Sequence, residues 1–215
     1  MSEGLFKQMA QAVIEGDEDE AAALAQRGLE EGIDPLEAIN KGFTAGMDVV
    51  GELYSSGEYF LPDLILGGEA MKAALAVLEP ALKASGQTRQ VLGIVVLGTV
   101  KGDIHEIGKS LVGSMLSANG FEVLDLGIDI DAGEFVTKAR EYGADIVALS
   151  ALLTTTMLHQ QEVIEHLAEA GLRDRVKVMV GGSPVTQGWA DQIGADGFAE
   201  DAAGAVVVAK WLMGA

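Results

Sequence analysis

The chain of 215 residues contains no cysteine. This absence excludes disulfide bonds, thiolate zinc sites, iron–sulfur clusters and cysteine nucleophiles. The sequence also has no run of about eighteen apolar residues, the length that a membrane-spanning helix needs, and its N-terminus lacks the charged-then-apolar pattern of a signal peptide. We therefore expect a cytoplasmic protein that does not span a membrane.

Basic residues are also few: 14 lysines and arginines stand against 33 acidic residues, which gives a formal charge of −19. A surface this negative repels phosphate backbones, so we expect no binding to nucleic acid. The charge favours solubility and would also attract basic protein partners. Hydrophobic residues make up 49% of the chain, enough to build a buried core.

Residues 1–84 have the pattern of helices only, because apolar residues recur at helical spacing and strand-like runs are missing. Asp34-Pro35 is typical of a helix start, with aspartate as the N-cap and proline in the first turn. A fourth helical segment opens at Leu61. Four helices joined by short links predict an antiparallel bundle. Residues 85–89 are polar and are interpreted as a linker between two domains.

Residues 90–215 alternate between short apolar runs and amphipathic segments. This alternation predicts α/β architecture, with a five-stranded parallel, doubly wound sheet of the Rossmann-like or flavodoxin-like kind. The predicted strands are 91–97, 122–126, 145–149, 177–180 and 197–199, and the predicted helices are 107–119, 132–142, 157–170, 186–193 and 203–213.

The glycine-rich stretch Gly98–Gly108 joins the first predicted strand to its helix and contains Asp103 and His105. Open α/β sheets bind ligands outside the carboxyl ends of their strands, where this stretch lies. An imidazole binds cobalt, zinc or iron, but one histidine alone cannot complete a protein-only metal site. A lone ligand fits a metal held in a macrocycle, with Asp103 fixing the imidazole tautomer. The alternative is a solvated loop histidine beside an ordinary turn residue.

Three motifs in this half of the chain carry a resemblance to a known family. Residues 103–108, D-I-H-E-I-G, match the D-x-H-x-x-G signature of cobalamin-binding proteins, and Ser150-Ala151-Leu152 and Gly181-Gly182 match the S-x-L and G-G elements that follow it. In methyl-transferring members a helical bundle directly precedes this domain. The chain therefore resembles, over almost its whole length, the corrinoid proteins that serve methanol, methylamines or methoxy compounds, and the cobalamin module of methionine synthase.

The resemblance implies that His105 is the lower ligand of the cobalt in a bound cobalamin, in place of the cofactor's own benzimidazole. Asp103 would hydrogen-bond His105, and Ser150 would continue this relay while cobalt cycles between cob(I) and methyl-cob(III) states. The nucleotide tail of the cofactor would lie inside the protein. The other residues implied at the cofactor site are Gly102, Ile104, Glu106, Gly108, Leu152, Thr154, Gly181, Gly182, Ser183 and Ala202.

Residues 51–62 of the bundle resemble the cap segment of the family. This match implies that Tyr54 and Leu61 cover the upper face of the corrin. The alternative is that both residues belong to the core of the bundle. The other two histidines, His159 and His166, are interpreted as surface or packing residues on one helix.

The resemblance implies a methyl carrier rather than a complete enzyme. A substrate:corrinoid methyltransferase would place a methyl group on cobalt, a second methyltransferase would pass it to an acceptor such as tetrahydrofolate or a thiol, and a reductive activase would restore oxidised cobalt. A cobalamin-dependent regulator is one alternative, but this acidic chain has no room for a basic helix-turn-helix segment. An adenosylcobalamin mutase subunit would lack the helical cap, and a flavin protein would leave D-x-H-x-x-G unexplained. The sequence does not identify the methyl donor.

Overall fold

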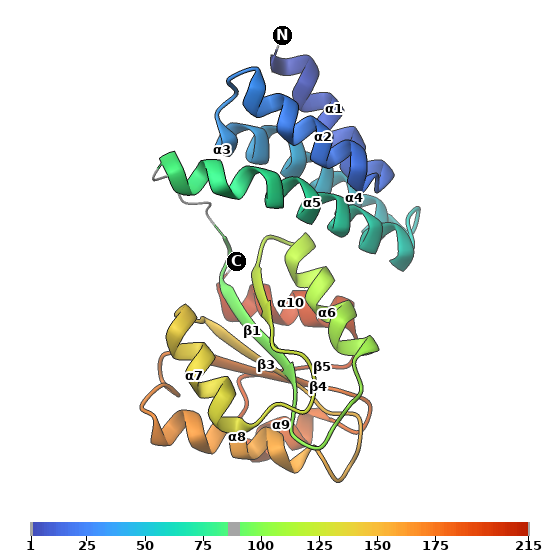
Figure 1. Cartoon of the computed structure of the whole chain (residues 1–215). Helices are drawn as coiled ribbons and strands as arrows, with labels where there is room; N and C mark the ends of the chain where they lie inside the picture. The colour runs from blue at the N-terminus through green and yellow to red at the C-terminus, as the bar shows by residue number, and fades with distance from the viewer. Residues whose placement is uncertain (1, 86–90, 215) are drawn as a thin grey trace. The chain divides into compact units, whose positions relative to one another are not determined.

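A computed structural model describes residues 2–85 and 91–214 of the chain (Figure 1). The chain divides into two compact units, Met1–Gln90 with Ser117–Asn119, and Val91–Leu116 with Gly120–Ala215. Of the linker expected at 85–89, Ser85 closes the last helix of the first unit, and the remaining residues lie outside the described part of the chain.

The first unit is helical. Its elements are α1 (Ser2–Glu15), α2 (Glu18–Glu30), α3 (Pro35–Glu37), the π-helix η1 (Ala38–Phe43), α4 (Thr44–Ser56) and α5 (Leu61–Ser85). Because α3, η1 and α4 follow one another without a break, they form the third of the four predicted helices. Its start is the predicted one: the carboxylate of Asp34 accepts hydrogen bonds from the backbone N–H groups of Leu36 (3.0 Å) and Glu37 (3.1 Å). The apolar face of this helix, including Ile39 and Phe43, is buried.

The second unit is a five-stranded sheet with the order β2-β1-β3-β4-β5, and every neighbouring pair is parallel. The strands are β1 (Ile94–Thr99), β2 (Glu122–Asp125), β3 (Ile146–Ser150), β4 (Lys177–Gly181) and β5 (Gly197–Ala199). This order is the flavodoxin-like one, in which the direction of the crossovers reverses between β1 and β3. The predicted doubly wound α/β fold is therefore confirmed, and the order decides between its two kinds.

Five helices cover the two faces of this sheet (Figure 1). Helices α7 (Ala132–Tyr142), α8 (Leu158–Glu169) and α9 (Gln187–Ile193) pack on one face, and α6 (Ile107–Ala118) and α10 (Ala202–Leu212) lie on the other. The face under α7, α8 and α9 holds a continuous buried apolar cluster that includes Phe135, Val163 and Leu167. This cluster fixes the strands whose carboxyl ends carry the candidate site.

The first strand differs from its prediction at both ends. It begins at Ile94 rather than Val91 and continues through Thr99, so the connection to α6 is shorter than Gly98–Gly108. Gly98 lies inside the strand because α7 packs closely there: a Cβ at this position would stand 2.7 Å from Cζ of Phe135. The glycine therefore serves helix–sheet packing, not the loop that its composition indicated.

Candidate cofactor site

Asp103 and His105 lie in the connection between β1 and α6, at the carboxyl edge of the sheet. The side chain of Asp103 is fully buried. Its Oδ1 accepts two hydrogen bonds from His105, one from the backbone N–H at 3.1 Å and one from the ring Nδ1 at 2.7 Å. One carboxylate oxygen thus fixes both the backbone and the ring of the histidine, as the sequence predicts for a second-layer partner of a metal ligand.

The second carboxylate oxygen of Asp103 is held by the loop after β3. Its Oδ2 accepts hydrogen bonds from Thr156 Oγ1 at 2.6 Å and from the backbone N–H groups of Leu152 and Leu153 at 2.8 and 3.3 Å. The relay therefore continues to Thr156, and the expected link to Ser150 is absent from the described residues. Ser150 is the last residue of β3 and lines a cavity instead, whereas Thr156 stands in the turn that reaches back to Asp103.

Opposing effects act on the pKa of Asp103. Burial raises it, but the hydrogen bonds from Thr156, the Leu152 N–H and His105 together hold the pKa well below its ordinary value. The carboxylate is therefore ionised at neutral pH and acts only as an acceptor. It follows that Nδ1 of His105 donates this hydrogen bond, so Nε2 is the ring nitrogen with the lone pair when the imidazole is neutral.

The ring of His105 is accessible, with 45% of its side chain exposed. Its main chain is fixed on the other side as well, since Thr99 Oγ1 donates a hydrogen bond of 2.9 Å to the His105 carbonyl. In the described part of the chain, no three histidine, aspartate or glutamate side chains gather to hold a metal ion by themselves. His105 can therefore supply one ligand to a metal whose other ligands come from the bound group.

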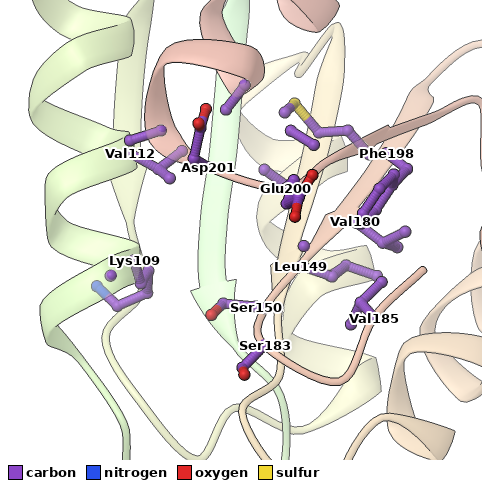
Figure 2. A pocket seen from close by; sticks show the side chains of 18 of the residues that line it. Lys109, Val112, Leu149, Ser150, Val180, Ser183, Val185, Phe198, Glu200 and Asp201 are labelled. Atoms are coloured by element: carbon purple, nitrogen blue, oxygen red, sulfur yellow. The ribbon is translucent and has the colours of Figure 1, made fainter. Parts of the chain in front are cut away.

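A cavity of about 730 Å³ opens beside His105, on the face of the sheet under α6 and α10 (Figure 2). Figure 2 shows Lys109 and Val112 on α6 at one side of it and Val180 and Phe198 at the other. The walls combine apolar side chains with the hydroxyls of Ser150, at the end of β3, and Ser183, after β4. Its lining residues include Leu97, Leu111, Val112, Ala148, Ser150, Met179, Val180, Ser183, Val185, Thr186, Phe198, Glu200 and Asp201.

The structure brings most of the expected cofactor residues to this cavity. Those that line it are His105, Gly108, Ser150, Leu152, Gly181, Gly182, Ser183 and Ala202. Gly102, Asp103, Ile104, Glu106 and Thr154 do not line it. Of these, Asp103 is buried behind His105, and Ile104 is 71% exposed at the same edge of the sheet. Tyr54 and Leu61 belong to the helical unit, where both are half-buried and neither is part of its fully buried core.

One member of the glycine pair at the end of β4, Gly182, is required by the packing of its loop. Gly182 has φ +122°, and a Cβ there would stand 1.8 Å from the carbonyl oxygen of Ala151. Only glycine allows this loop to pack against the loop after β3. Gly108 differs from Gly182, because a Cβ at this cavity-lining position would meet no atom within 4 Å. Space for a ligand is thus kept at Gly108, and loop packing is kept at Gly182.

Two buried polar residues near the cavity were not predicted from the sequence. The side chain of Lys109 is fully buried and forms an ion pair with Asp125 at the end of β2. Gln160 is also fully buried: its amide nitrogen donates to the carbonyls of Leu149 (3.0 Å) and Gly181 (3.2 Å), and its oxygen accepts from Trp189 Nε1 at 3.0 Å. Gln160 thereby ties the ends of β3 and β4 together below the loops that form the site.

These features fit a cofactor that brings a metal in a macrocycle and a long appendage. An accessible imidazole whose Nδ1 is bonded to Asp103 would offer its Nε2 to such a metal, and the cavity beside it offers a partly apolar slot. The other two histidines have hydrogen-bond partners within their own helix, α8. Nδ1 of His159 lies 2.7 Å from the carboxylate of Glu162, and Nδ1 of His166 lies 2.8 Å from the carbonyl oxygen of Glu162. They are surface residues of α8, as interpreted.

Comparison with known proteins agrees with this fit. A family model described as B12 binding domain matches residues 93–207, and a second model of the same description matches residues 5–79. A corrinoid protein of Desulfitobacterium hafniense is 50% identical over 98% of both chains. Trimethylamine corrinoid protein 2 of Methanosarcina mazei is 48% identical over 97% of this chain and 95% of its own length.

A solved structure extends the likeness to three dimensions. The methanol:cobalamin methyltransferase complex of Methanosarcina barkeri contains a chain that matches with a TM-score of 0.87 and 33% identity, over 98% of this chain and 80% of that one. In the described residues, no helix is both long and apolar enough to cross a membrane. Both halves of the chain are matched by B12-binding models and its relatives match it end to end, so this protein belongs to the family of cobalamin-binding corrinoid proteins.

Proposed function

We propose that this corrinoid protein carries a methyl group on the cobalt of its cobalamin. A first methyltransferase would load the group from a small donor, and a second would pass it to an acceptor such as tetrahydrofolate or a thiol. A reductive activase would serve as a third partner. The observation that carries the proposal is the ionised, buried Asp103 that holds Nδ1 of the accessible His105 beside a cavity of about 730 Å³.

When bound, the cobalamin supplies the cobalt atom that accepts and gives up the methyl group. The work of the protein is to hold this atom in a defined state. Asp103 accepts the hydrogen bond of the His105 Nδ1–H, so that Nε2 would be the ring atom offered to the cobalt, and Thr156 fixes the position of the Asp103 carboxylate. A carboxylate partner of this kind orients the ring and raises its basicity as a ligand.

The cavity under α6 and α10 would hold the nucleotide tail. Leu111 and Val112 offer apolar surface for a planar base, and the hydroxyls of Ser150 and Ser183 offer hydrogen bonds to its polar groups. The helical unit would supply the apolar cover of the other side of the cofactor through Tyr54 and Leu61. Such a cover excludes water and oxidants from a reactive bond.

The relatives support methylamines as the first donors to test. The M. mazei relative is called a trimethylamine corrinoid protein, and the matching M. barkeri complex is called a methanol:cobalamin methyltransferase complex. The assay combines the cobalamin-loaded protein with a partner methyltransferase and each donor in turn, and it follows the visible spectrum of the cofactor. A donor-dependent spectral change with a methylamine or methanol is expected, and no change with any donor and partner would contradict the carrier function.

The role of His105 is tested by His105→Ala in protein loaded with cob(II)alamin. The substitution removes the imidazole but no core packing, so the free energy of unfolding should change little. In protein labelled with nitrogen-15 histidine, the wild type should show the two-line splitting of a nitrogen-15 ligand in its electron paramagnetic resonance spectrum, and His105→Ala should lose this splitting even where the cofactor's own benzimidazole binds the cobalt instead. His159→Ala is the matched control, since it removes a surface imidazole bonded to Glu162. A coupling that persists unchanged in His105→Ala would contradict the assignment.

A further inference from the structure

The turn formed by residues 100–103, which precedes His105, is hydrogen-bonded to the loop after β2. A hydrogen bond of 3.1 Å from the Asp103 N–H to the Val100 carbonyl closes the turn, and its third residue, Gly102, has φ +77°. Turns with a positive φ at this position require glycine or asparagine there. The turn is therefore a specific conformation, and it delivers Asp103 and His105 to the edge of the sheet.

Asp129 contacts this turn through two hydrogen bonds. Its Oδ1 accepts the backbone N–H of Gly102 at 2.6 Å, and its own backbone N–H donates to the carbonyl of Asp103 at 3.0 Å. The two bonds thus hold the main chain of Gly102 and Asp103, the residues directly before Ile104 and His105. Asp129 therefore fixes the main chain of Asp103, whose carboxylate is the hydrogen-bond partner of His105.

The backbone of Asp129 is unusual in a way that serves this clamp. Its φ is +56°, and within the described residues it is the only non-glycine residue with a positive φ. This left-handed conformation is unfavourable for a residue with a Cβ, and asparagine and aspartate tolerate it best. The neighbouring Ile130 continues the strand pairing, since its N–H donates to Thr99 at 3.0 Å. The strained residue is therefore held in place by the sheet.

We infer that Asp129 is a positioning residue for His105, which sets the fraction of the bound cobalamin that has the imidazole as its lower ligand. This inference rests on the proposed function. Asp129 itself does not touch the ring, but it fixes the backbone of Asp103, whose carboxylate holds Nδ1 at 2.7 Å. Indirect partners of metal ligands matter because ligand geometry must be held within about 0.5 Å and 10–20°.

Three substitutions separate the acceptor of Asp129 from its backbone conformation. Asp129→Gly keeps the left-handed conformation and removes the acceptor, Asp129→Asn keeps both, and Asp129→Ala removes both. The control Asp174→Ala removes an exposed carboxylate from the turn between α8 and β4. Each protein is labelled with nitrogen-15 histidine and loaded with cob(II)alamin, and the fraction of cobalt coupled to nitrogen-15 is measured by electron paramagnetic resonance.

Asp129→Gly should lower the ratio of histidine-bound to histidine-free cobalt by about 10-fold, the lower end of the effect that such indirect partners have. Asp129→Asn should stay within about 2-fold of the wild type, because its side-chain oxygen replaces the lost acceptor. Asp174→Ala should match the wild type. A wild-type ratio in Asp129→Gly, or a loss in Asp129→Asn as large as in Asp129→Gly, would overturn the inference.

A second measurement does not depend on how any variant folds. In wild-type protein without cofactor, amide hydrogen exchange at Gly102 should be slowed by about 10-fold or more relative to an unprotected amide, because its N–H is bonded to Asp129. An unprotected Gly102 amide would overturn the inference. Failure of the proposed function has a different signature, namely labelled wild-type protein that binds cob(II)alamin without coupling to the nitrogen-15 of a histidine.

Discussion

The two faces of the sheet are built from the same strands but differ in how they are filled. The register places Val96, Val147 and Val178 in one row across the sheet, and all three belong to the apolar cluster under α7, α8 and α9. The next row, Leu97, Ala148 and Met179, points to the opposite face and lines the cavity. Alternation along each strand thus assigns one row to the core and the next to the site.

This difference separates stability from binding within one small domain. The face under α7, α8 and α9 contains fully buried side chains such as Phe135 and Leu167. The face under α6 and α10 has half-buried residues such as Leu111 and Val112 beside a cavity of about 730 Å³. A protein that had filled both faces would be more stable and would have no slot for the appendage of a cofactor. Substitutions on the packed face should therefore mainly lower the free energy of unfolding, whereas substitutions on the hollow face should mainly weaken cofactor binding.

The largest expected difference comes from removing side chains on the two faces. Phe135→Ala should lower the free energy of unfolding by about 3–5 kcal/mol, because it leaves a void in a packed core. Val112→Ala should cost about 1 kcal/mol or less, since the side chain is half-buried beside existing space. Urea denaturation of the two apoproteins measures both values. Equal losses would contradict the view that only one face is packed.

The next effect concerns the loop that closes the hollow face. Gly182→Ala should cost about 3 kcal/mol, because it combines a left-handed backbone with a contact that the loop cannot accommodate. The control is Gly143→Ala at the end of α7, where φ is also positive (+63°) but a Cβ would meet nothing within 4 Å. This control should cost about 1 kcal/mol. If the two substitutions cost the same, the close approach to Ala151 is not important.

The filled face was largely predictable from the sequence, because apolar periodicity reports which residues are buried. The predicted strands and helices all exist, and most boundaries agree within one or two residues. The error at β1 arose because Gly98 was interpreted as part of a loop. Glycine stands at this position because Phe135 of α7 packs against it. The two residues are far apart in the sequence, so no local pattern indicates this contact.

The hollow face was predictable only where a motif marks it. Asp103, His105 and the glycine pair were found through the family signature, whereas Thr156 and Lys109 were not. Thr156 reaches Asp103 across a separation of 53 residues, and Lys109 pairs with Asp125 across 16. Such partners are set by how the loops fold back over the sheet, which spacing alone does not determine. A run of three threonines, 154–156, was the only local signal for Thr156.

Thr156 links the two faces, since it stands in the turn that leads into α8 and also holds the Asp103 carboxylate. Thr156→Val keeps the shape of the side chain but leaves the buried carboxylate with one donor fewer. This should cost about 1–3 kcal/mol, and Thr156→Ser should recover most of the loss because it restores the hydroxyl. Thermal unfolding of the apoproteins measures both. A serine variant as unstable as the valine variant would show that the methyl group, not the hydroxyl, is needed.

The smallest effect on stability should come from filling the cavity itself. Gly108 lies in the first turn of α6, lines the cavity, and has open space where a Cβ would stand. Replacing a helical glycine gains up to about 1 kcal/mol of helix propensity, so Gly108→Phe should leave the free energy of unfolding nearly unchanged.

Cobalamin retention during gel filtration should nevertheless fall strongly in Gly108→Phe, because the ring takes up part of the slot for the nucleotide tail. Glu134→Phe is the matched control, since it adds the same ring to an exposed position in the first turn of α7. This control should retain cobalamin like the wild type. A Gly108→Phe protein that keeps its cobalamin would place the tail elsewhere and remove the reason for one face being hollow. A protein that unfolds instead would mean that this space is needed by the fold.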